Sequence, residues 1–298
     1  MLYSIENNIT TEQLINSLPS YEEALSPYYG NTIVIKMGGS LMDNQDAIQA
    51  LAVDVLVLKR CGITPIIVNG GGKAIDRALN NDHPLKIAGY RVTDESTAIT
   101  INDVLFNVSK NIVNEIANYY DSVFLTTAEA IQGCQVFNCK PREVFLDNGT
   151  LADLKFVGKI TGVNLASLFR ILDDDKIPIV GSTALGENNK IYNCNADDAA
   201  ANMAIACKAD NLIFLTEANG IYDKNGETCH NLSEDEVLDM INKGELASQI
   251  LPKLEGVLEA LEKDVPNVSV IDGRTNHSVL LELLNYDSPS YLGTRFYK

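Results

Sequence analysis

Short apolar segments recur along the chain, and most are apolar at every position instead of at alternate positions. This pattern is typical of strands that are buried on both faces, as in a parallel sheet. We predict six strands of this kind, over residues 32–36, 65–69, 122–126, 177–181, 211–216 and 267–271.

Segments with apolar residues three or four positions apart lie between the predicted strands and indicate helices. Alternating strands and helices predict an α/β fold with right-handed crossovers around a mainly parallel sheet. No Pro- or Ser-rich linker divides the chain, so any two lobes should share one continuous sheet. The predicted helices span residues 44–60, 72–81, 95–118, 164–175, 196–208, 234–243, 253–264 and 277–284.

The segment 127–160 departs from this alternation. It contains Gly133, Pro141 and the turn pair Asn148-Gly149 between short β-prone pieces. Turn residues between short strands are typical of β-hairpins. We therefore expect hairpins at one edge of the sheet.

A helical arm is predicted ahead of the first strand, over residues 10–27. Thr10 or Thr11 can cap it, and Pro19 interrupts it. Its apolar residues favour docking against the rest of the protein over a frayed terminus; they are Leu14, Ile15 and Leu18.

Composition and charge exclude several function classes. The 298 residues carry 40 acidic and 23 basic side chains, which gives a formal charge of −17. Nonspecific nucleic-acid binding relies on many Lys and Arg residues, so no nucleic-acid partner is expected. No apolar run reaches the roughly 18 residues of a membrane-spanning helix, and the first residues lack the pattern of a signal peptide. We expect no membrane partner and a cytoplasmic location, or the plastid stroma for an organelle-encoded chain.

The six cysteines and three histidines offer little for metal binding. The cysteines form no C-x-x-C pair, and a structural zinc site needs closely spaced ligands. We expect no metal site, and we expect free, mostly buried thiols.

Two glycine-rich turns follow the first two predicted strands. The first strand runs into Lys36-Met-Gly38-Gly39, and the second into Asn69 and the glycines at 70–72, ahead of a helix. Glycine lets the backbone approach an anion, and the start of a helix favours negative charge. Neither turn matches the P-loop or dinucleotide fingerprints. One such turn alone would indicate a tight bend, whereas two at successive strand ends indicate a phosphate or carboxylate site.

Three charged residues stand near loops that ligands approach in open parallel sheets. Arg91 can grip a carboxylate through two hydrogen bonds, or it can be a surface arginine without a role. Asp197 starts a helix, where it can favour the helix dipole or orient lysines. Lys253 starts another helix against the dipole preference, which indicates an anion beside it; a chance surface lysine is the alternative.

Taken in order, these motifs resemble those of the amino-acid kinase family over almost the whole chain, from about residue 32 to 294. Arg91 and Asn193 favour the branch that acts on N-acetylglutamate over carbamate, aspartate or uridylate kinases. The shared motifs are the Lys-Met-Gly-Gly turn, the triple glycine, Gly-Tyr-Arg-Val-Thr-Asp at 89–94, Asn-Cys-Asn-Ala-Asp at 193–197 and Leu-Thr-Glu-Ala-Asn-Gly-Ile at 215–221.

The resemblance implies a three-layer αβα sandwich around a mainly parallel open sheet, the carbamate kinase-like fold. It implies an N-terminal helical arm (1–30), an N-terminal lobe (31–183) for acyl amino acid binding and dimerisation, and a C-terminal lobe (184–298) for ATP. The implied reaction is ATP-dependent phosphorylation of the side-chain carboxylate of N-acetyl-L-glutamate, the second step of arginine biosynthesis, with Mg²⁺ accompanying ATP.

The resemblance also implies residue roles. Lys36 and Lys253 would flank the transferring phosphoryl group, and Asp197 would hold both lysines in place. The acyl amino acid would contact Gly71, Gly72, Arg91 and Asn193. The nucleotide would contact Gly38, Gly39, Glu217, Asn219, Gly220, Tyr222 and Ala247.

Residues 10–30 are similar to the N-terminal helix of arginine-inhibited, hexameric members, in which this arm links dimers into a ring. The implied assembly is a homodimer, or a hexamer built through the arm, with L-arginine as a feedback inhibitor. The arginine would lie near His277, Glu282 and Gly293.

Several positions depart from the family pattern. Asn69 stands where histidine is usual, Glu217 replaces a common aspartate, and Ser-Gln-Ile at 248–250 replaces Gly-Gly-Met; residues 126–140 and 285–291 also differ. Three alternatives therefore stay open. They are a sister kinase for another acylated acidic amino acid, a divergent regulatory member of low activity, and a non-enzymatic sensor of arginine or nucleotide.

Overall fold

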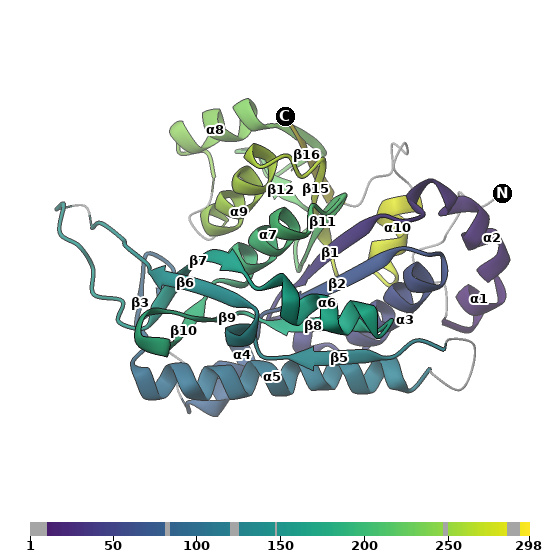
Figure 1. The fold of residues 1–298 in the computed structure, drawn as a ribbon. Coiled ribbons are helices and arrows are strands. Elements are labelled where there is room, and N and C mark those ends of the chain that lie inside the picture. The colour runs from purple at the N-terminus through teal and green to yellow at the C-terminus, as the bar shows by residue number, and fades with distance from the viewer. Residues whose placement is uncertain (1–10, 81–83, 120–124, 147, 247–249, 285–292) are drawn as a thin grey trace.

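A computed structural model describes residues 11–80, 84–119, 125–146, 148–246, 250–284 and 293–298. The strands of its central sheet are β1 (Thr32–Met37), β2 (Thr64–Asn69), β5 (Ala128–Ile131), β8 (Ile177–Gly181), β11 (Asn211–Thr216), β14 (Asn231–Ser233), β15 (Asn267–Asp272) and β16 (Gly293–Tyr297). Their order is β14-β16-β15-β11-β1-β2-β8-β5 (Figure 1). Neighbouring strands are parallel except for the antiparallel pair β15–β16. The predicted mainly parallel sheet is confirmed, and it contains strands from both proposed lobes.

Helices cover both faces of this sheet, because successive strand residues point to opposite sides. Ile33 and Ile35 of β1 pack on the side of the first helix layer, whereas Val34 packs on the other side. This is the three-layer sandwich that the resemblance implies. The first layer holds α3 (Gln45–Arg60), α5 (Glu95–Ala117) and α10 (Ser278–Leu284), and the second holds α6 (Leu165–Asp173), α7 (Ala196–Cys207), α8 (Glu234–Asn242) and α9 (Leu251–Glu262).

The predicted helices agree with these bounds, and α4 (Gly72–Ala78) is the one that ends furthest from its predicted end. Polar caps set several helix starts. Asn44 accepts hydrogen bonds from the first turn of α3, and Asp94 accepts one from the backbone N–H of Thr97 in α5 at 2.8 Å. Short 3₁₀ turns lie at Ser26–Tyr28, Leu41–Asp43, Gly133–Gln135 and Glu187–Asn189.

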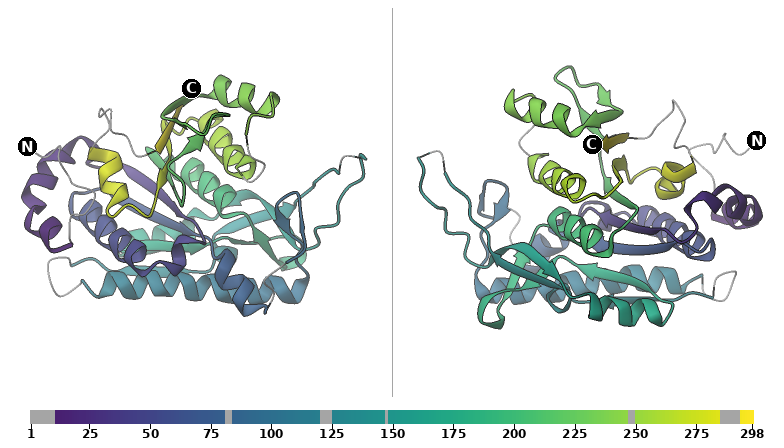
Figure 2. Two further views of the ribbon diagram at one scale, coloured as in Figure 1. Left: turned by 180° about the vertical axis from the view of Figure 1, so that it is seen from behind. Right: turned by 45° about the horizontal axis from the view of Figure 1, so that its top comes forward.

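For residues 127–160, the predicted hairpin is confirmed, because the consecutive strands β6 (Phe137–Pro141) and β7 (Val157–Val163) pair antiparallel, but its predicted place at one edge of the sheet is wrong. Strand β5 is the edge of the central sheet, while β6 and β7 join β9 (Thr183–Leu185) and β10 (Ile191–Cys194) in a closed four-stranded barrel. The strands that close the barrel lie far along the chain, so local turn signals do not reveal it. The segment that connects β6 to β7 forms a further hairpin, which extends away from the other elements (Figures 1 and 2) and has Gly149 at a φ of 77° in its turn.

The strand predicted at 122–126 lies mostly outside the described residues. Residues 122–124 lie outside the described ranges, Leu125 and Thr126 belong to no strand, and β5 begins at Ala128. Two small sheets complete the fold; they pair β3 (Lys86–Ile87) with β4 (Tyr90–Arg91), and β12 (Ile221–Tyr222) with β13 (Thr228–Cys229).

The N-terminal arm folds as α1 (Thr11–Asn16) and α2 (Leu18–Ala24) and lies beside α3 and α10 (Figure 2). Pro19 stands in the first turn of α2, where a missing N–H costs nothing, so it helps to start a second helix. Leu18, Tyr21 and Leu25 are buried in the core that includes α3 and α10, which confirms the predicted docking. Thr10 and the side chains of Leu14 and Ile15 lie outside the description.

All six cysteines are free thiols, as expected, but only Cys61, Cys139 and Cys194 are buried and the other three are partly exposed. Among the helices of the described ranges, none combines the length and apolar character that crossing a bilayer requires.

Candidate active site

Three charged residues meet near the carboxyl end of β1. Lys36 shares the orientation of Val34 and so faces the layer that contains α7. Its Nζ lies 2.8 Å from Oδ1 of Asp197, and the Nζ of Lys253 lies 3.0 Å from the same oxygen. Asp197 stands in the first turn of α7, where the side chain of the N-cap Asn195 accepts its backbone N–H. The two lysines therefore come from opposite ends of the chain to one carboxylate.

Burial and charge act in opposite directions on the pKa of Asp197. Burial alone would raise it, but the positive charges of Lys253 and Lys36 outweigh burial and hold the pKa below its usual range. For Lys253, burial lowers the pKa to about 8, although Asp197 offsets part of the effect. Two ammonium groups on one carboxylate give the cluster a positive surplus, which favours an incoming anion.

The two glycine-rich turns pack directly against each other. A Cβ added to Gly39 would lie 2.4 Å from the backbone N of Gly72, so no side chain fits at position 39. The N–H of Gly70 donates to the carbonyl of Met37 at 3.1 Å, which ties the second turn to the first. Gly71 precedes α4 and Gly72 begins it. Gly38 stands beside the Lys36 ammonium, since a Cβ there would lie 3.7 Å from Nζ.

Asn69, one of the departures from the family pattern, supports the second glycine turn. Its side chain is fully buried, and its Oδ1 accepts a hydrogen bond from the Ser109 hydroxyl at 2.7 Å. Because Ser109 belongs to α5, this bond fixes the end of β2 against that helix.

A cleft of about 260 Å³ lies beside these groups. Its lining includes Lys36, Gly39, the glycines at 70–72, Arg91 and Asn193. Asp197 and Lys253 do not line the cleft, but they adjoin it through the ion pair with Lys36. The Nδ2 of Asn193 lies 3.4 Å from Oγ1 of Thr93. Lys86 and Ser182 also line the cleft, and sequence analysis did not single them out.

Arg91 lies on the β3–β4 hairpin instead of in the loop that its sequence context indicated. The two turn residues of this hairpin, Ala88 and Gly89, have φ values of 47° and 84°, as in the tight turns that join two short strands. One guanidinium nitrogen, Nη2, is paired with Asp76 of α4. The other, Nη1, is buried and has no hydrogen-bond partner among the described residues. A carboxylate in the cleft would supply that partner.

The residues predicted for the nucleotide lie in the turn after β11, apart from the glycines beside Lys36. Gly220 has a φ of 101°, and a Cβ there would lie 2.5 Å from Oγ1 of Thr294, so glycine is required. The N–H of Asn219 donates to the Tyr222 hydroxyl at 3.1 Å. The negative charge of Glu217 contributes to raising the pKa of Arg274, after the hydrogen bond and charge of Asp272. Arg274 is thus a half-exposed cation near this turn that sequence analysis missed; Ala247 lies outside the described residues.

The residues predicted for arginine binding contact α3 and β15 and are not part of the cleft lining. His277 is buried and its Nδ1 lies 2.7 Å from Oδ1 of the buried Asp54 in α3. Glu282 is paired with Arg295, and Gly293 packs against Ile271 of β15. The arm lies beside α10, because the Tyr28 hydroxyl donates to the carbonyl of Leu283 at 3.0 Å.

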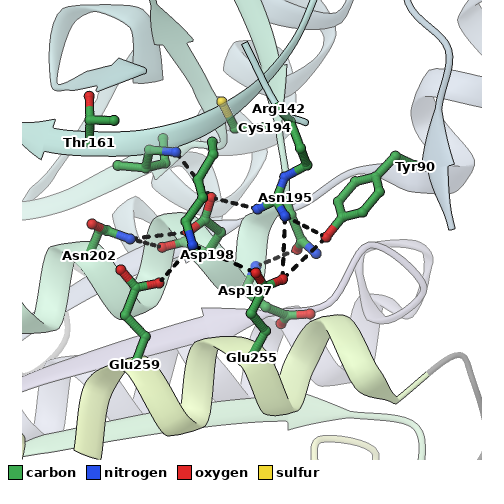
Figure 3. Close-up of polar contacts among 12 residues, drawn as sticks. Tyr90, Arg142, Thr161, Cys194, Asn195, Asp197, Asp198, Asn202, Glu255 and Glu259 are labelled. Atoms are coloured by element: carbon green, nitrogen blue, oxygen red, sulfur yellow. Dashed lines mark hydrogen bonds and ion pairs between the residues drawn. The ribbon is translucent and has the colours of Figure 1, made fainter. Parts of the chain in front are cut away.

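A buried polar group beside the lysine cluster also escaped sequence analysis. Arg142 follows β6 and donates to Tyr90, Glu255 and Asp198, which belong to β4, α9 and α7 (Figure 3). No local pattern marks Arg142, because its partners come from three distant segments.

A glycine-lined cleft beside a buried Lys–Asp–Lys cluster is an arrangement suited to phosphoryl transfer. The family model "Amino acid kinase family" matches residues 31–272, and the chain belongs to this family. Among curated relatives, acetylglutamate kinase of Aquifex aeolicus is 36% identical over 91% of this chain and 95% of its own length. Acetylglutamate kinase of Herminiimonas arsenicoxydans is 33% identical over 94% of each chain.

Solved structures share the fold at lower identity. N-acetylglutamate synthase from Neisseria gonorrhoeae, complexed with coenzyme A and N-acetyl-glutamate, is 23% identical with a TM-score of 0.78. The match covers 97% of this chain and 64% of that longer one. Carbamate kinase from Giardia is 13% identical, with a TM-score of 0.64 over 90% of this chain and 99% of that chain.

Proposed function

We propose that this protein transfers the γ-phosphoryl group of ATP to the side-chain carboxylate of N-acetyl-L-glutamate. The observation that carries the proposal is the single Asp197 oxygen that holds Lys36 and Lys253 beside a cleft with a buried, half-satisfied arginine. Relatives named acetylglutamate kinase, 33–36% identical over nearly the whole chain, support the choice of acceptor.

The chemistry suits these residue types. An acceptor carboxylate is already ionised at neutral pH, so no general base is required. One of its oxygens forms a bond to the γ-phosphorus while the bond from that phosphorus to the β–γ bridging oxygen breaks, and the electron pair leaves with ADP. Repulsion between two anions is the main barrier. Lys36 and Lys253 would lower it by stabilising charge on the transferring group and the leaving oxygen.

Substrate placement follows from the cleft. Arg91, through Nη1, and Asn193 would bind the acyl amino acid, and the backbone N–H groups of Gly71 and Gly72 would approach the carboxylate oxygens. ATP would lie with its phosphates near Gly38 and Gly39 and its nucleoside near Glu217, Asn219, Gly220 and Tyr222, with Ala247 close by.

Mg²⁺ would accompany ATP. The described residues contain no group of three or more His, Cys, Asp or Glu side chains that could hold a metal ion. The nucleotide phosphates and water would therefore supply most of its ligands, as is usual for this ion. When bound, Mg²⁺ neutralises phosphate charge; the protein's part is to align the phosphates beside the lysines.

An acceptor panel tests the proposal. ADP release is measured with N-acetyl-L-glutamate, L-glutamate and N-acetyl-L-aminoadipate, with and without hydroxylamine to trap the acyl phosphate. We expect turnover with N-acetyl-L-glutamate, with trapped hydroxamate equal to ADP. Preference for aminoadipate would favour a sister kinase, and binding without turnover would favour a regulatory or sensing member. Turnover that survives Lys36→Met would contradict the role given to Lys36.

Arginine inhibition, assembly and location form a second part of the proposal. We infer that L-arginine binds near His277, Glu282 and Gly293 and inhibits the enzyme. We infer that two chains associate as a homodimer through the lobe of residues 31–183, and that the arm of residues 1–30 allows these dimers to form a hexamer. We place the enzyme in the cytoplasm. The arm packs against α3, which carries Asp54, and α10, which directly follows His277, and this supports the placement. Inhibition assays with L-arginine and D-arginine, combined with mass measurement in solution, test it.

A further inference from the structure

Arg142 joins three elements of the active site through one buried side chain. Its Nη1 donates to the Tyr90 hydroxyl at 2.8 Å and lies 3.3 Å from Oε2 of Glu255. Its Nη2 donates to Oδ2 of Asp198 at 3.2 Å. The guanidinium also lies 4.5 Å from the centre of the Tyr90 ring. Figure 3 shows the three partners converging on Arg142 from separate elements.

Each partner of Arg142 is a near neighbour of a residue in the proposed site. Tyr90 precedes Arg91 on β4, Asp198 follows Asp197 on α7, and Glu255 lies two positions after Lys253 on α9. The hairpin that carries Arg91 also contacts α9 directly, because the Tyr90 hydroxyl donates to Oε2 of Glu255 at 3.4 Å. The hydrogen bonds of one arginine thus span the acyl amino acid side, the catalytic carboxylate and the helix of the second lysine.

The Asp198 partner is itself fixed. Its Oδ2 also accepts the backbone N–H of Ile160 at 3.1 Å, and its Oδ1 accepts from Asn202 at 3.1 Å. Asp198 is 5% exposed and Arg142 is 9% exposed, so this ion pair is shielded from water. By contrast, Glu255 is exposed and Tyr90 is half-buried. Asp198 therefore holds one end of the Arg142 guanidinium in place. The contacts of Arg142 with Tyr90 of the hairpin and Glu255 of α9 are closer to solvent and can change more easily.

We propose that Arg142 is a positioning residue that couples the Arg91 hairpin to the Lys253 helix, so that acyl amino acid binding and phosphate alignment depend on each other. The inference rests on the proposed function, since it assigns the acceptor to the hairpin and the phosphoryl group to Lys253. A planar guanidinium is suited to this, because it donates in several fixed directions at once. Lysine at position 142 would keep the charge but not the divergent hydrogen bonds.

The test is a double-mutant cycle between the two ends of the coupling. Tyr90→Phe removes the hydroxyl and keeps the ring, and Glu255→Gln removes the charge on α9. For each variant and for the double variant, calorimetry gives the dissociation constant of N-acetyl-L-glutamate and of MgADP, and thermal unfolding gives the Tm. Glu129→Gln and Arg170→Gln break an ion pair between β5 and α6 and serve as matched controls.

We expect effects that cross from one side to the other. Glu255→Gln, on α9, should weaken N-acetyl-L-glutamate binding by about three- to thirtyfold, although Glu255 lies outside the cleft lining. Tyr90→Phe should weaken MgADP binding in the same direction. The two substitutions should be non-additive, by about threefold or more. Because Tyr90 also donates directly to Glu255 at 3.4 Å, part of this non-additivity should persist in an Arg142→Lys background, and the part that Arg142 carries should be lost there. A structural role alone would lower the Tm of each variant without these cross effects.

The outcomes separate this inference from the proposed function. Additive effects, unchanged affinities in both single variants, or non-additivity of the same size in the Arg142→Lys background overturn the coupling, while wild-type turnover upholds the kinase. If the wild-type protein binds another acylated acidic amino acid instead, the acceptor assignment fails and the same cycle is measured with that compound. If no acylated acidic amino acid binds, both fail together. Tyr90 is half-buried and Glu255 is exposed, so both single variants should fold. Their measured affinities therefore test the inference even if Arg142→Lys does not fold.

Discussion

Lys36 and Lys253 donate to the same oxygen atom, Oδ1 of Asp197, at 2.8 and 3.0 Å. The two ammonium groups would repel each other in this buried position without the carboxylate between them. Asp197 therefore holds like charges together, and the surplus positive charge faces the cleft. A phosphoryl group in transfer gathers negative charge on its oxygens, which is the species that this arrangement stabilises best.

Asp197→Asn should abolish this arrangement while changing few atoms. The lysines would lose their shared anion and move apart, so we expect kcat to fall by about a hundred- to thousandfold. Steady-state kinetics of ADP release measure the change. The matched control is Asp175→Asn, which breaks the exposed Lys59–Asp175 pair and should leave kcat within twofold, about the scatter expected of a surface change. A kcat near the wild-type value in Asp197→Asn would remove Asp197 from the mechanism.

The lowered pKa of Lys253, about 8, predicts an alkaline limb in the activity profile. The ammonium form stabilises the phosphates, so kcat/KM for ATP should fall as pH rises through about 8. The same lowered pKa should affect the free energy of unfolding in the opposite direction to its effect on activity. Between about pH 8 and the unfolded value near 10.4, the folded protein binds fewer protons than the unfolded chain, so unfolding free energy rises with pH.

Lys253→Arg checks the assignment of that limb. Arginine stays protonated across the whole range, so the limb near pH 8 should flatten although the rate is lower. Lys243→Arg, at the exposed C-cap of the preceding helix α8, is the control and should keep the limb. A profile in which Lys253→Arg titrates like the wild-type protein would place the limb on another group.

The sequence predicts elements well where the signal is local, and less well where partners are distant. The helices over α3, α5 and α7 agree with prediction because polar caps and apolar periodicity are both local. The barrel was missed because β6 and β7 are completed by β9 and β10, which follow an entire helix and strand later.

The site follows the same rule. The glycine turns and Lys36 were visible because strand ends and glycine runs are local signals, and family resemblance linked them to Asp197 and Lys253. Arg142 carries no such signal, since its position after a β-strand is ordinary and its partners are Tyr90, Asp198 and Glu255. Its role becomes apparent only when three segments are placed together.

Two glycines of the paired turns should respond differently to alanine. In Gly39→Ala the new Cβ would lie 2.4 Å from backbone N of Gly72, so we expect a loss of about 1–3 kcal/mol in unfolding free energy together with activity. In Gly72→Ala the Cβ meets nothing within 4 Å, but it would stand at the cleft lining. That variant should keep its stability and raise the KM for N-acetyl-L-glutamate.

Urea unfolding and steady-state kinetics measure the two effects separately. Gly162→Ala on β7 is the control, because its Cβ also meets nothing within 4 Å and it lies outside the cleft lining. Equal KM values in Gly72→Ala and Gly162→Ala would mean that the start of α4 does not contact the acceptor.

The docked arm should contribute to the stability of the domain, whatever its part in assembly. Tyr21 is 1% exposed and packs in the core shared with α3 and α10, so Tyr21→Ala should lower the unfolding free energy by about 3–5 kcal/mol. Glu23→Ala, at an exposed position on the same helix, should change it by less than about 0.5 kcal/mol. Urea unfolding of both variants at several protein concentrations separates this packing from any effect of assembly, because only the latter depends on concentration.

An unfolding midpoint for Tyr21→Ala equal to that of Glu23→Ala would mean that the arm is undocked in solution. Since deletion of residues 1–28 removes the same buried contacts, loss of arginine inhibition in such a deletion is informative only if its unfolding midpoint is measured alongside.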